Sequence, residues 1–470
     1  MFKKTKIVAT IGPVSENQKT MEKMIKAGMN VIRLNFSHGN YGEHLKRIKL
    51  AREAGKKFEK PIAVLQDLCG PKIRIGDFYK ESIVLKEGQI FTLTTKKCVG
   101  NEKKVFINYN RLPKEIKKGA KIMLNDGKNE LLTEKISGND IHCRIIIGGE
   151  IKGRRGVNFP GASLSIGSLT TKDKKDALFG IKHKVDFMAI SFVKSAKDIL
   201  ELKNIIKKHN ANIKIIAKIE IQDAIKNIDG IIEAADAVLV ARGDLAVEVP
   251  MEQVPILQKM IIKKSNATGK PVIIATQMLE SMIRNSLPTR AEVNDIANAV
   301  LDGADAVMLS EETTLGRYPV KAVETMARIV GYTEKKLNYE EILNRHRLKE
   351  KNVADSISFA VVNVAHNIGA KAIVALTESG FTSKMISRYR PQQPILALTS
   401  NRKTFSQLAL NFGCHPRLMK KFDGLSSVIS EAKKLSVKYK MAGKGDKIVI
   451  TAGIPFGKSG GTNLLIAQTI

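Results

Sequence analysis

The sequence of 470 residues contains no tryptophan, few aromatic residues (5%) and only four cysteines. The cysteines have no CxxC spacing, so we expect neither a zinc site nor a disulfide framework. No apolar run is long enough to cross a bilayer, and the basic N-terminus leads directly into a strand-like segment rather than a signal peptide. These absences predict a cytoplasmic protein with no membrane partner.

Acidic residues are also scarce, because 46 Asp and Glu stand against 78 Lys and Arg, a formal net charge of +32. A basic surface can condense on phosphate backbones, so a polyanion-binding protein is one alternative. However, the lysines are spread along the whole chain, and no basic stretch is interleaved with stacking aromatics. We therefore expect no specific nucleic-acid partner. The charge would instead steer anionic substrates into a cleft or reflect a bias toward lysine on solvated faces.

The chain is too long for one ordinary core, and its first part alternates short apolar strands with amphipathic stretches. Nearly continuous apolar strands indicate a parallel sheet covered by helices, and eight of them predict a closed (β/α)8 TIM barrel. The predicted barrel strands are 6–11, 30–36, 62–68, 185–192, 213–220, 237–241, 272–276 and 306–310. One helix is well marked, because Thr289 and Glu292 form a capping box and Gly303 follows its end.

The alternation stops after Asp67. From about residue 71 to residue 157, hairpin signals such as the Asn-Asp-Gly-Lys run at 125–128 predict a small all-β lid domain. The charged segment at 333–351 is predicted to be a connecting helix. A last α/β unit follows it, with strands near 372–376, 394–398 and 447–451. We place the barrel at 1–70 and 158–335, the inserted β domain at 71–157 and the C-terminal α/β regulatory domain at 336–470.

The second predicted strand has an unusual polar face. Its alternation at period two puts Arg33, Asn35 and Ser37 on one side of an extended strand, and Gly39 follows in a turn. Such a triplet suits a strand whose C-terminal end opens onto a site for anions and cations.

Other strand ends complete the donor set of a phosphoryl-transfer site. Active sites of (β/α)8 barrels lie at the C-terminal ends of the strands. That face would carry the side chains of Asp67, Lys218, Glu220, Arg242, Asp244 and Thr276. Carboxylate oxygens bind hard divalent cations, and cations stabilise a phosphoryl group in transfer.

Each of these residues also has a purely structural interpretation. Lys218 and Glu220 could lie on the solvated face of an edge strand, and Arg242 could form a local ion pair with Asp244 at a turn. Asp67 could open a turn, and the Thr276 hydroxyl could be an ordinary strand end. The pattern alone therefore predicts a polar barrel mouth and no more.

The strand ends resemble those of pyruvate kinase, and the resemblance runs essentially from end to end. The matching segments occur in the family's order, at 5–13, 28–39, 70–74, 218–220, 241–245, 275–281 and 288–292. The resemblance implies an enzyme that transfers the phosphoryl group of phosphoenolpyruvate to ADP, giving ATP and pyruvate in glycolysis. It also implies a homotetramer. The enzymatic alternative is another barrel acting on pyruvate or phosphoenolpyruvate, such as a lyase.

The resemblance implies a role for each residue at the barrel mouth. Glu220 and Asp244 would hold Mg²⁺, and Gly243, Asp244 and Thr276 would receive the substrate carboxylate. Lys218 would stabilise the phosphoryl group and Arg33 would hold the phosphate. Thr276 would also lie near the enolate face that becomes protonated.

A second group of residues would serve the nucleotide, again as the resemblance implies. Its phosphates would meet Asn35, His38, Arg74 and Arg155, and a second Mg²⁺ would arrive on ADP. Asp126 would line the lid.

The chain departs from the family at a position tied to potassium. Where potassium-dependent members have Glu, this sequence has Lys72. Their K⁺ is held by positions matching Asn35, Ser37, Asp67 and Leu68. Because a tethered ammonium can supply the charge of the ion, we expect that K⁺ is not required. Lys72 could otherwise be a solvated hinge residue.

The C-terminal domain carries a hydroxyl-rich loop between a strand and a helix. Hydroxyls and a glycine at a helix N-terminus can bind an anion, and the family uses a similar loop for a phosphorylated activator. The residues concerned are Thr377, Ser379, Gly380, Thr382 and Ser383. The alternative is an ordinary helix cap. Glu311, where many family members have Gly, has no assigned role.

Overall fold

The computed structural model describes residues 3–346, 352–420, 424–455 and 461–470. Eight parallel strands close into a barrel in the order β1-β16-β15-β14-β13-β12-β3-β2. Their bounds are β1 (Lys6–Thr10), β2 (Val31–Asn35), β3 (Ala63–Asp67), β12 (Phe187–Ile190), β13 (Lys214–Ile219), β14 (Ala237–Ala241), β15 (Val272–Ala275) and β16 (Ala306–Leu309). The predicted (β/α)8 fold is confirmed.

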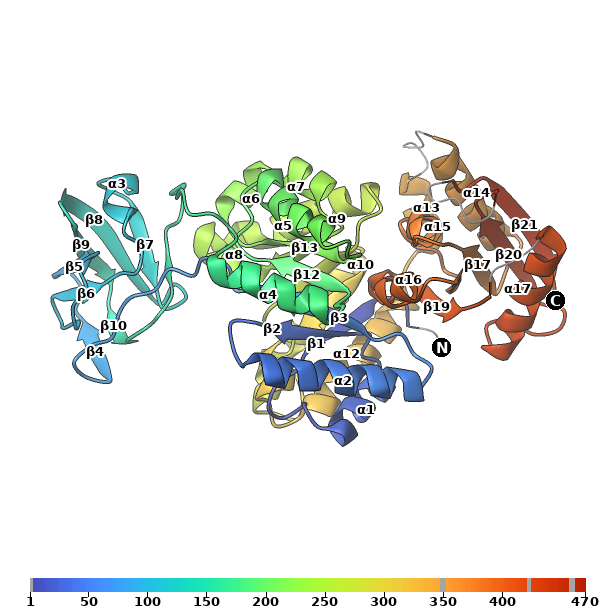
Figure 1. Cartoon of the computed structure of the whole chain (residues 1–470), viewed down its shortest axis with the longest axis horizontal. Helices are drawn as coiled ribbons and strands as arrows, with labels where there is room; N and C mark the ends of the chain where they lie inside the picture. The colour runs from blue at the N-terminus through green and yellow to red at the C-terminus, as the bar shows by residue number, and fades with distance from the viewer. Residues whose placement is uncertain (1–2, 347–351, 421–423, 456–460) are drawn as a thin grey trace.

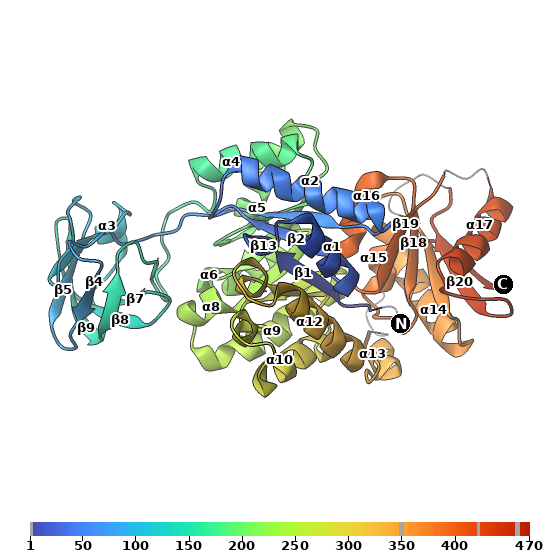
Figure 2. The same cartoon turned by 90° about the horizontal axis from the view of Figure 1, so that it is seen from below.

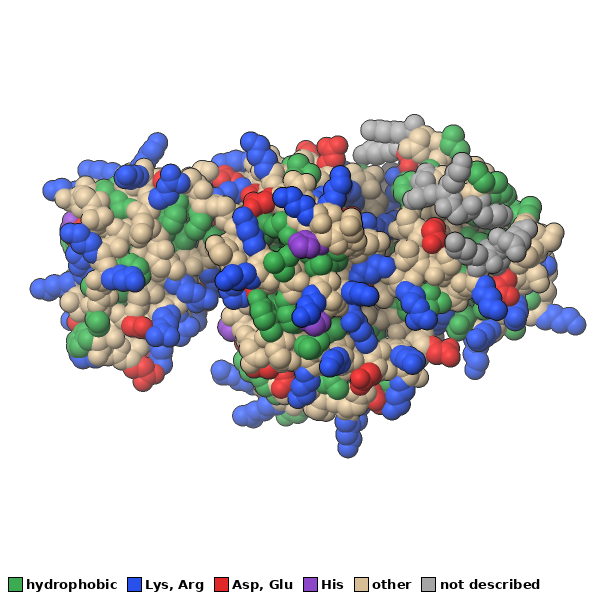
Figure 3. All heavy atoms as spheres, in the orientation of Figure 1, with side chains coloured by type: hydrophobic (Ala, Val, Ile, Leu, Met, Phe, Trp, Pro, Cys, Tyr) green, Lys and Arg blue, Asp and Glu red, His purple; other side chains and the backbone are tan. Residues whose placement is uncertain are grey.

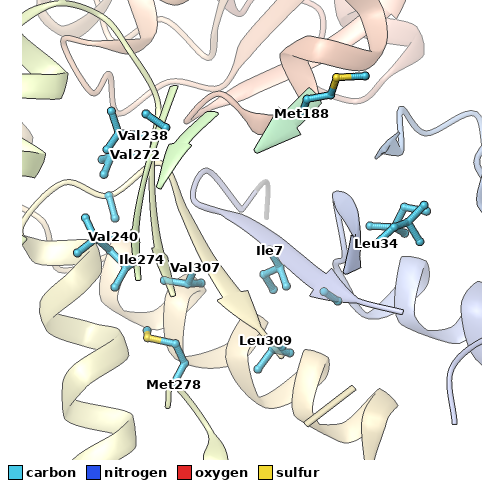
Figure 4. Packing of buried hydrophobic residues seen from close by; sticks show 14 of the residues in the cluster. Ile7, Leu34, Met188, Val238, Val240, Val272, Ile274, Met278, Val307 and Leu309 are labelled. Carbon is cyan, nitrogen blue, oxygen red and sulfur yellow. The ribbon is translucent and has the colours of Figure 1, made fainter. Parts of the chain in front are cut away.

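Successive residues of each barrel strand face opposite sides of the barrel wall. Apolar strands therefore pack side chains inside the barrel and also against the helices that surround it. The inward residue Val8 packs in the barrel interior, and its neighbour Ile7 packs in the layer between strands and helices. Figure 4 shows part of that outer layer. The main helices are α1 (Gln18–Ala27), α2 (Tyr41–Lys57), α4 (Thr171–Lys182), α5 (Ala196–Lys208), α9 (Val254–Ala267), α10 (Arg290–Leu301) and α12 (Pro319–Glu334). The predicted capping box of Thr289 and Glu292 begins α10.

The chain leaves the barrel after β3 and forms a separate β domain, which lies to one side of the barrel in Figure 1. It contains a six-stranded sheet in the order β11-β7-β8-β9-β5-β6 and a two-stranded sheet of β10 and β4. Its elements are β4 (Ser82–Leu85), β5 (Ile90–Thr94), β6 (Lys104–Phe106), α3 (Leu112–Glu115), β7 (Lys121–Leu124), β8 (Asn129–Ser137), β9 (Asp140–Ile147), β10 (Gly149–Lys152) and β11 (Val157–Asn158). A hydrophobic cluster of its own makes it an independent packing unit.

The C-terminal α/β domain has a five-stranded sheet in the order β19-β18-β17-β20-β21. The predicted strands match β17 (Ala372–Leu376), β18 (Ile395–Thr399) and β20 (Lys447–Ala452), whereas β19 (Cys414–Leu418) and β21 (Leu464–Thr469) were not predicted. Its helices include α13 (Tyr339–His346), α14 (Val353–Asn367), α15 (Phe381–Ser387), α16 (Arg402–Gln407) and α17 (Leu425–Lys438). The charged segment predicted as a helix at 333–351 contains α13, and 347–351 lie outside the described residues.

The three domains lie in a row, with the barrel in the middle (Figures 1 and 2). The C-terminal domain covers the N-terminal end of the barrel, where the Lys6 Nζ donates to the Cys414 carbonyl. Ala409 and Leu410 of the short helix η4 (Leu408–Leu410) join the cluster inside the barrel. The inserted domain is attached at the opposite end, beside the C-terminal ends of the strands. Among the described residues, no helix is both long and apolar enough to cross a membrane.

Candidate active site at the barrel mouth

A cleft lies between the inserted domain and the C-terminal ends of the barrel strands, and its free space, counted out to open solvent, is about 810 Å³. The inserted domain and its connections contribute Lys72, Asp126 and Asn158 to the lining, and the barrel contributes Asp244 and Glu248. Several hydrogen bonds attach the returning connection to the barrel, among them those of Asn158 and Ser163. Asn158 Nδ2 donates to Glu248 Oε1 at 3.0 Å, and the Ser163 hydroxyl donates to Asp223 Oδ2 at 2.9 Å.

Lys218 is the centre of a buried charge network at the end of β13. Its Nζ lies 2.7 Å from Glu220 Oε1 and 3.4 Å from Asp67 Oδ1, and it donates to the Ser191 hydroxyl at 2.8 Å. Burial alone would lower the pKa of Lys218, but the carboxylates of Asp67 and Glu220 outweigh burial and raise it. The ammonium therefore stays charged, and it is held in place from three sides. The interpretation of an edge strand with a solvated face is wrong.

Arg33 shares the Asp67 carboxylate with Lys218. Arg33 Nε and Nη2 lie 2.7 and 2.6 Å from Asp67 Oδ2, and Nη1 donates to the Thr10 hydroxyl at 3.0 Å. Burial would raise the pKa of Asp67, but Lys218 and Arg33 lower it below its ordinary value. Asp67 thus serves as an anionic anchor for both cations instead of opening a turn.

Two carboxylates with unequal surroundings lie beside this network. Glu220 is buried, and its Oε2 accepts the backbone N–H of Phe192 at 2.7 Å. Burial raises the pKa of Glu220, Lys218 lowers it, and the neighbouring Asp244 raises it again. Asp244 lines the cleft and has no ion pair or hydrogen bond to its carboxylate among the described residues. Asp244 is unpaired, and its charge disfavours the ionised form of Glu220. Together the two carboxylates form a donor set that fits a hard divalent cation.

Thr276 is held in an uncommon backbone conformation after β15. Thr276 and Gln277 have φ values of 71° and 54°, in the left-handed region. The Thr276 hydroxyl accepts the backbone N–H of Gly243 at 2.8 Å and donates to the Ala275 carbonyl at 2.5 Å. The ends of β14 and β15 are therefore joined at the residues predicted to receive a carboxylate.

Arg242 holds that conformation in place. It donates to the carbonyls of Ala275 at 3.2 Å and Thr276 at 2.7 Å, and its Nη1 lies 2.6 Å from Asp295 Oδ1 on α10. The alternative that Arg242 pairs with Asp244 is therefore wrong. Asp295 carried no sequence signal, because its partner is 53 residues away in the chain.

The polar triplet of the second strand divides at the strand end. Strand β2 stops at Asn35, and Ser37 lies in the following turn, where its backbone N–H donates to Asn35 Oδ1 at 3.1 Å. The prediction that Ser37 continues the strand face is wrong, because the turn breaks the alternation. His38 is exposed, and Leu68 is buried, with its carbonyl accepting from the Ser191 hydroxyl at 2.8 Å.

The predicted nucleotide residues of the inserted domain lie near its connections to the barrel. Arg74 Nη1 donates to the Arg154 carbonyl at 3.0 Å, and Arg155 is exposed. Asp126 and Lys72 line the cleft. Within the described ranges, no hydrogen bond or ion pair joins Arg74 or Arg155 to a barrel side chain.

The predicted effector loop is largely buried. Gly380 has a φ of 86° and precedes α15. Thr377 is 9% exposed, Thr382 is 4% exposed and Ser383 is fully buried. The Thr382 hydroxyl accepts from the Thr462 hydroxyl at 3.0 Å, and Ser379 lies in the bend before Gly380. A phosphate at this loop would therefore meet backbone groups more readily than these three hydroxyls.

Sequence reasoning also missed Glu312, next to the unassigned Glu311. The Glu312 carboxylate is buried and accepts backbone N–H groups of Leu279 at 3.0 Å and Ser310 at 2.7 Å. It thereby joins the segments that follow β15 and β16. Glu311 is exposed at the start of α11 (Glu311–Thr314), and nothing in its surroundings explains the residue.

Comparison with known proteins agrees with this geometry. The family model for the pyruvate kinase barrel domain matches residues 2–323, and the model for the pyruvate kinase alpha/beta domain matches residues 355–466. The pyruvate kinase of Clostridium acetobutylicum is 42% identical over the whole of both chains, and that of Thermotoga maritima is 44% identical over 99% of each. The crystal structure of a pyruvate kinase from Cryptosporidium parvum superposes with a TM-score of 0.95 at 35% identity, covering 99% of this chain and 96% of that one. The chain belongs to the pyruvate kinase family and is a phosphotransferase of that kind.

Proposed function

We propose that the barrel mouth transfers the phosphoryl group of phosphoenolpyruvate to ADP in glycolysis, with Mg²⁺ bound by Glu220 and Asp244. The observation that carries this proposal is the buried network in which Asp67 and Glu220 fix Lys218 beside the unpaired Asp244. When bound, Mg²⁺ would neutralise charge on the substrate and orient its oxygens. Phosphoryl transfer needs little covalent help, so positioning and charge supply the catalysis.

The residues of this chain would divide the work by location. Lys218 and Arg33 would bind the phosphoryl group, since both are charged and held by Asp67. The Gly243 and Asp244 backbone and the Thr276 hydroxyl would orient the substrate carboxylate. The Thr276 hydroxyl would also stand near the carbon that is protonated. Asn35, His38, Arg74 and Arg155 would bind nucleotide phosphates once the inserted domain moves toward the barrel, with Asp126 in its cleft wall.

A coupled assay for pyruvate tests the proposal. We expect activity with ADP, phosphoenolpyruvate and Mg²⁺, and none when Mg²⁺ is removed by a chelator. Glu220→Gln should keep the fold, bind Mn²⁺ more weakly in a spin-resonance titration and lose most of its turnover. Full turnover in the chelated enzyme would contradict the proposed metal site, and normal turnover of Glu220→Gln would contradict the assignment of its ligand.

We further propose that K⁺ is not required. Lys72 is exposed and lines the same cleft as Asp244, so its ammonium is available to that space. Asp67, one of the expected potassium ligands with Asn35, Ser37 and Leu68, is already neutralised by Arg33 and Lys218. Equal rates in potassium-free and potassium-containing buffer are expected, and a large stimulation by K⁺ would contradict this proposal.

Three further proposals rest on the family. A phosphorylated activator would bind at the loop of Thr377, Ser379, Gly380, Thr382 and Ser383, the enzyme would be a homotetramer, and it would be cytoplasmic. Domain boundaries at 70/71, 157/158 and 335/336 are proposed with them. Titration with candidate sugar phosphates and light scattering of the purified protein test the first two.

A further inference from the structure

A second hollow lies at the other end of the barrel, between the barrel and the C-terminal domain. Its walls are α2 on the barrel side and α16 with the end of α17 on the other. Its free space, counted out to open solvent, is about 1720 Å³. In Figure 3, blue Lys and Arg side chains gather along this boundary. We call this hollow the interdomain crevice.

The charge of the interdomain crevice is strongly unbalanced. Eight Lys and Arg side chains line it, against the two carboxylates of Glu59 and Asp186. Asp186 is fully engaged, because Oδ1 lies 2.9 Å from Lys403 Nζ and Oδ2 accepts the Val64 backbone N–H at 2.8 Å. It therefore cannot neutralise the other cations.

Most of these cations have no acidic partner. Arg52 is turned to the backbone, donating to the carbonyls of His183 and Lys184 at 2.8 and 2.9 Å. Within the described ranges, Lys56, Arg402 and Lys438 make no ion pair. Arg417 donates to the Pro416 carbonyl, yet its buried Nε has no hydrogen-bond partner among the described atoms.

Unpaired cations on both walls of a hollow repel one another unless an anion lies between them. These cations line one space from two domains. Arg52, Lys60 and Lys403 direct their charged ends to backbone carbonyls, which leaves the exposed Lys56 and Arg402 as free charges of the two walls. We propose that the interdomain crevice binds a small phosphate-bearing metabolite with at least two negative charges, and that this ligand bridges the barrel and the C-terminal domain. Cations on two facing walls can contact a compact ligand from both sides at once, which favours such a ligand over a nucleic-acid strand.

This site is separate from the proposed active site, and no residue of the loop at 377–383 lines it. The loop contacts the same helix α16, where the Thr404 hydroxyl donates to the Glu378 carbonyl at 2.7 Å. The cations of the crevice lie beside the N-terminal end of the barrel, whereas Lys218 and Asp244 lie at the opposite end. The crevice could therefore be filled while substrate occupies the mouth.

Calorimetric titration with pyrophosphate in the absence of Mg²⁺ tests the proposal on the full-length enzyme. The test variant is Lys56→Glu with Arg402→Glu, one exposed residue from each wall. The matched control is Lys96→Glu with Lys97→Glu, two exposed lysines of the inserted domain. We expect the test variant to weaken pyrophosphate binding by about tenfold or more and the control by less than about twofold. Lys218→Met should retain the crevice binding.

The proposal is overturned if the wild-type enzyme binds no pyrophosphate at about 10 mM, or if the test variant binds as tightly as the control. It is also overturned if binding disappears in Lys218→Met, because the ligand then lies at the barrel mouth. A further outcome also overturns the proposal: the wild-type enzyme binds a 20-nucleotide RNA but no pyrophosphate, and the test variant loses the RNA binding. The ligand of the crevice would then be a nucleic acid. Equal thermal midpoints of the ligand-free variants show that both are folded.

Discussion

The two ends of the barrel carry cations in opposite states. At the mouth, Lys218 and Arg33 are held by Asp67 and Glu220, so each charge has a fixed position and a partner. In the interdomain crevice, Lys56 and Arg402 have no carboxylate partner within the described ranges. Paired cations are preorganised for a transition state whose charge appears briefly. Unpaired cations are stabilised most by an anionic ligand that stays bound. The same residue types therefore suggest catalysis at one end of the barrel and ligand binding at the other.

The largest expected effect comes from breaking the paired state, with Lys218→Met. Removing the ammonium takes away a charge at the transferring group and leaves Asp67 and Glu220 without their common cation. We expect kcat to fall by about a thousandfold or more in the coupled pyruvate assay. Circular dichroism establishes that the variant is folded, and the exposed Lys96→Met is the matched control. A loss smaller than about tenfold would remove Lys218 from the mechanism.

A smaller effect is expected from the residue that shapes the mouth without carrying its charge. Arg242→Lys keeps a cation but loses the fork that reaches both the Ala275 and Thr276 carbonyls and Asp295. Because Thr276 would then relax from its left-handed conformation, we expect kcat to drop by about 10- to 100-fold with a smaller change in KM.

A variant of Asp295, the ion-pair partner of Arg242, tests the same contact from the other side. Asp295→Asn retains a hydrogen-bond acceptor for Arg242 and should be milder than Arg242→Lys. If Arg242→Lys raises only KM, or if its thermal midpoint falls while kcat is unchanged, Arg242 supports the fold and does not position Thr276.

Sequence patterns predicted most of the barrel because its strands are short apolar runs with polar ends. They also brought together Lys218, Glu220, Asp244 and Thr276, since the fold places strand ends at one face. The pairing of Arg33 and Lys218 through Asp67 could not be predicted, because those residues are on three different strands. Strand β21 was missed because it lies at the end of the sequence, where no helix or turn pattern follows it. Ser37 was assigned to the strand face because no residue type marks the end of β2 at Asn35.

A further variant, at Lys72, exchanges a tethered cation for a free monovalent ion. Lys72→Glu restores the acidic residue of potassium-dependent family members in the cleft next to Asp244. We expect its rate to fall by about tenfold in potassium-free buffer and to recover when KCl is added, because a monovalent ion can replace the lost ammonium. LiCl at the same ionic strength is the control. An equal response to both salts would mean that screening, and no specific ion, explains the change.

The smallest effect concerns a group near the mouth that is kept neutral. Burial, and then Arg47, lower the pKa of His44 from 6.5 to about 4. Its Nε2 lies 3.0 Å from the His38 carbonyl, its Nδ1 has no partner among the described residues, and its ring stacks on Phe36 at 4.0 Å.

Because the pKa of His44 is depressed in the folded protein, the imidazole is protonated in the unfolded chain at a higher pH than in the folded one. Stability from neutral His44 is therefore complete above about pH 6.5 and is lost as the pH falls toward 4, by at most about 1.4 kcal/mol per pH unit. His44→Gln should flatten the decline of the thermal midpoint between pH 6.5 and 4.5 by a few degrees. Parallel curves for the two proteins would show that the unpaired Nδ1 has no part in the acid sensitivity.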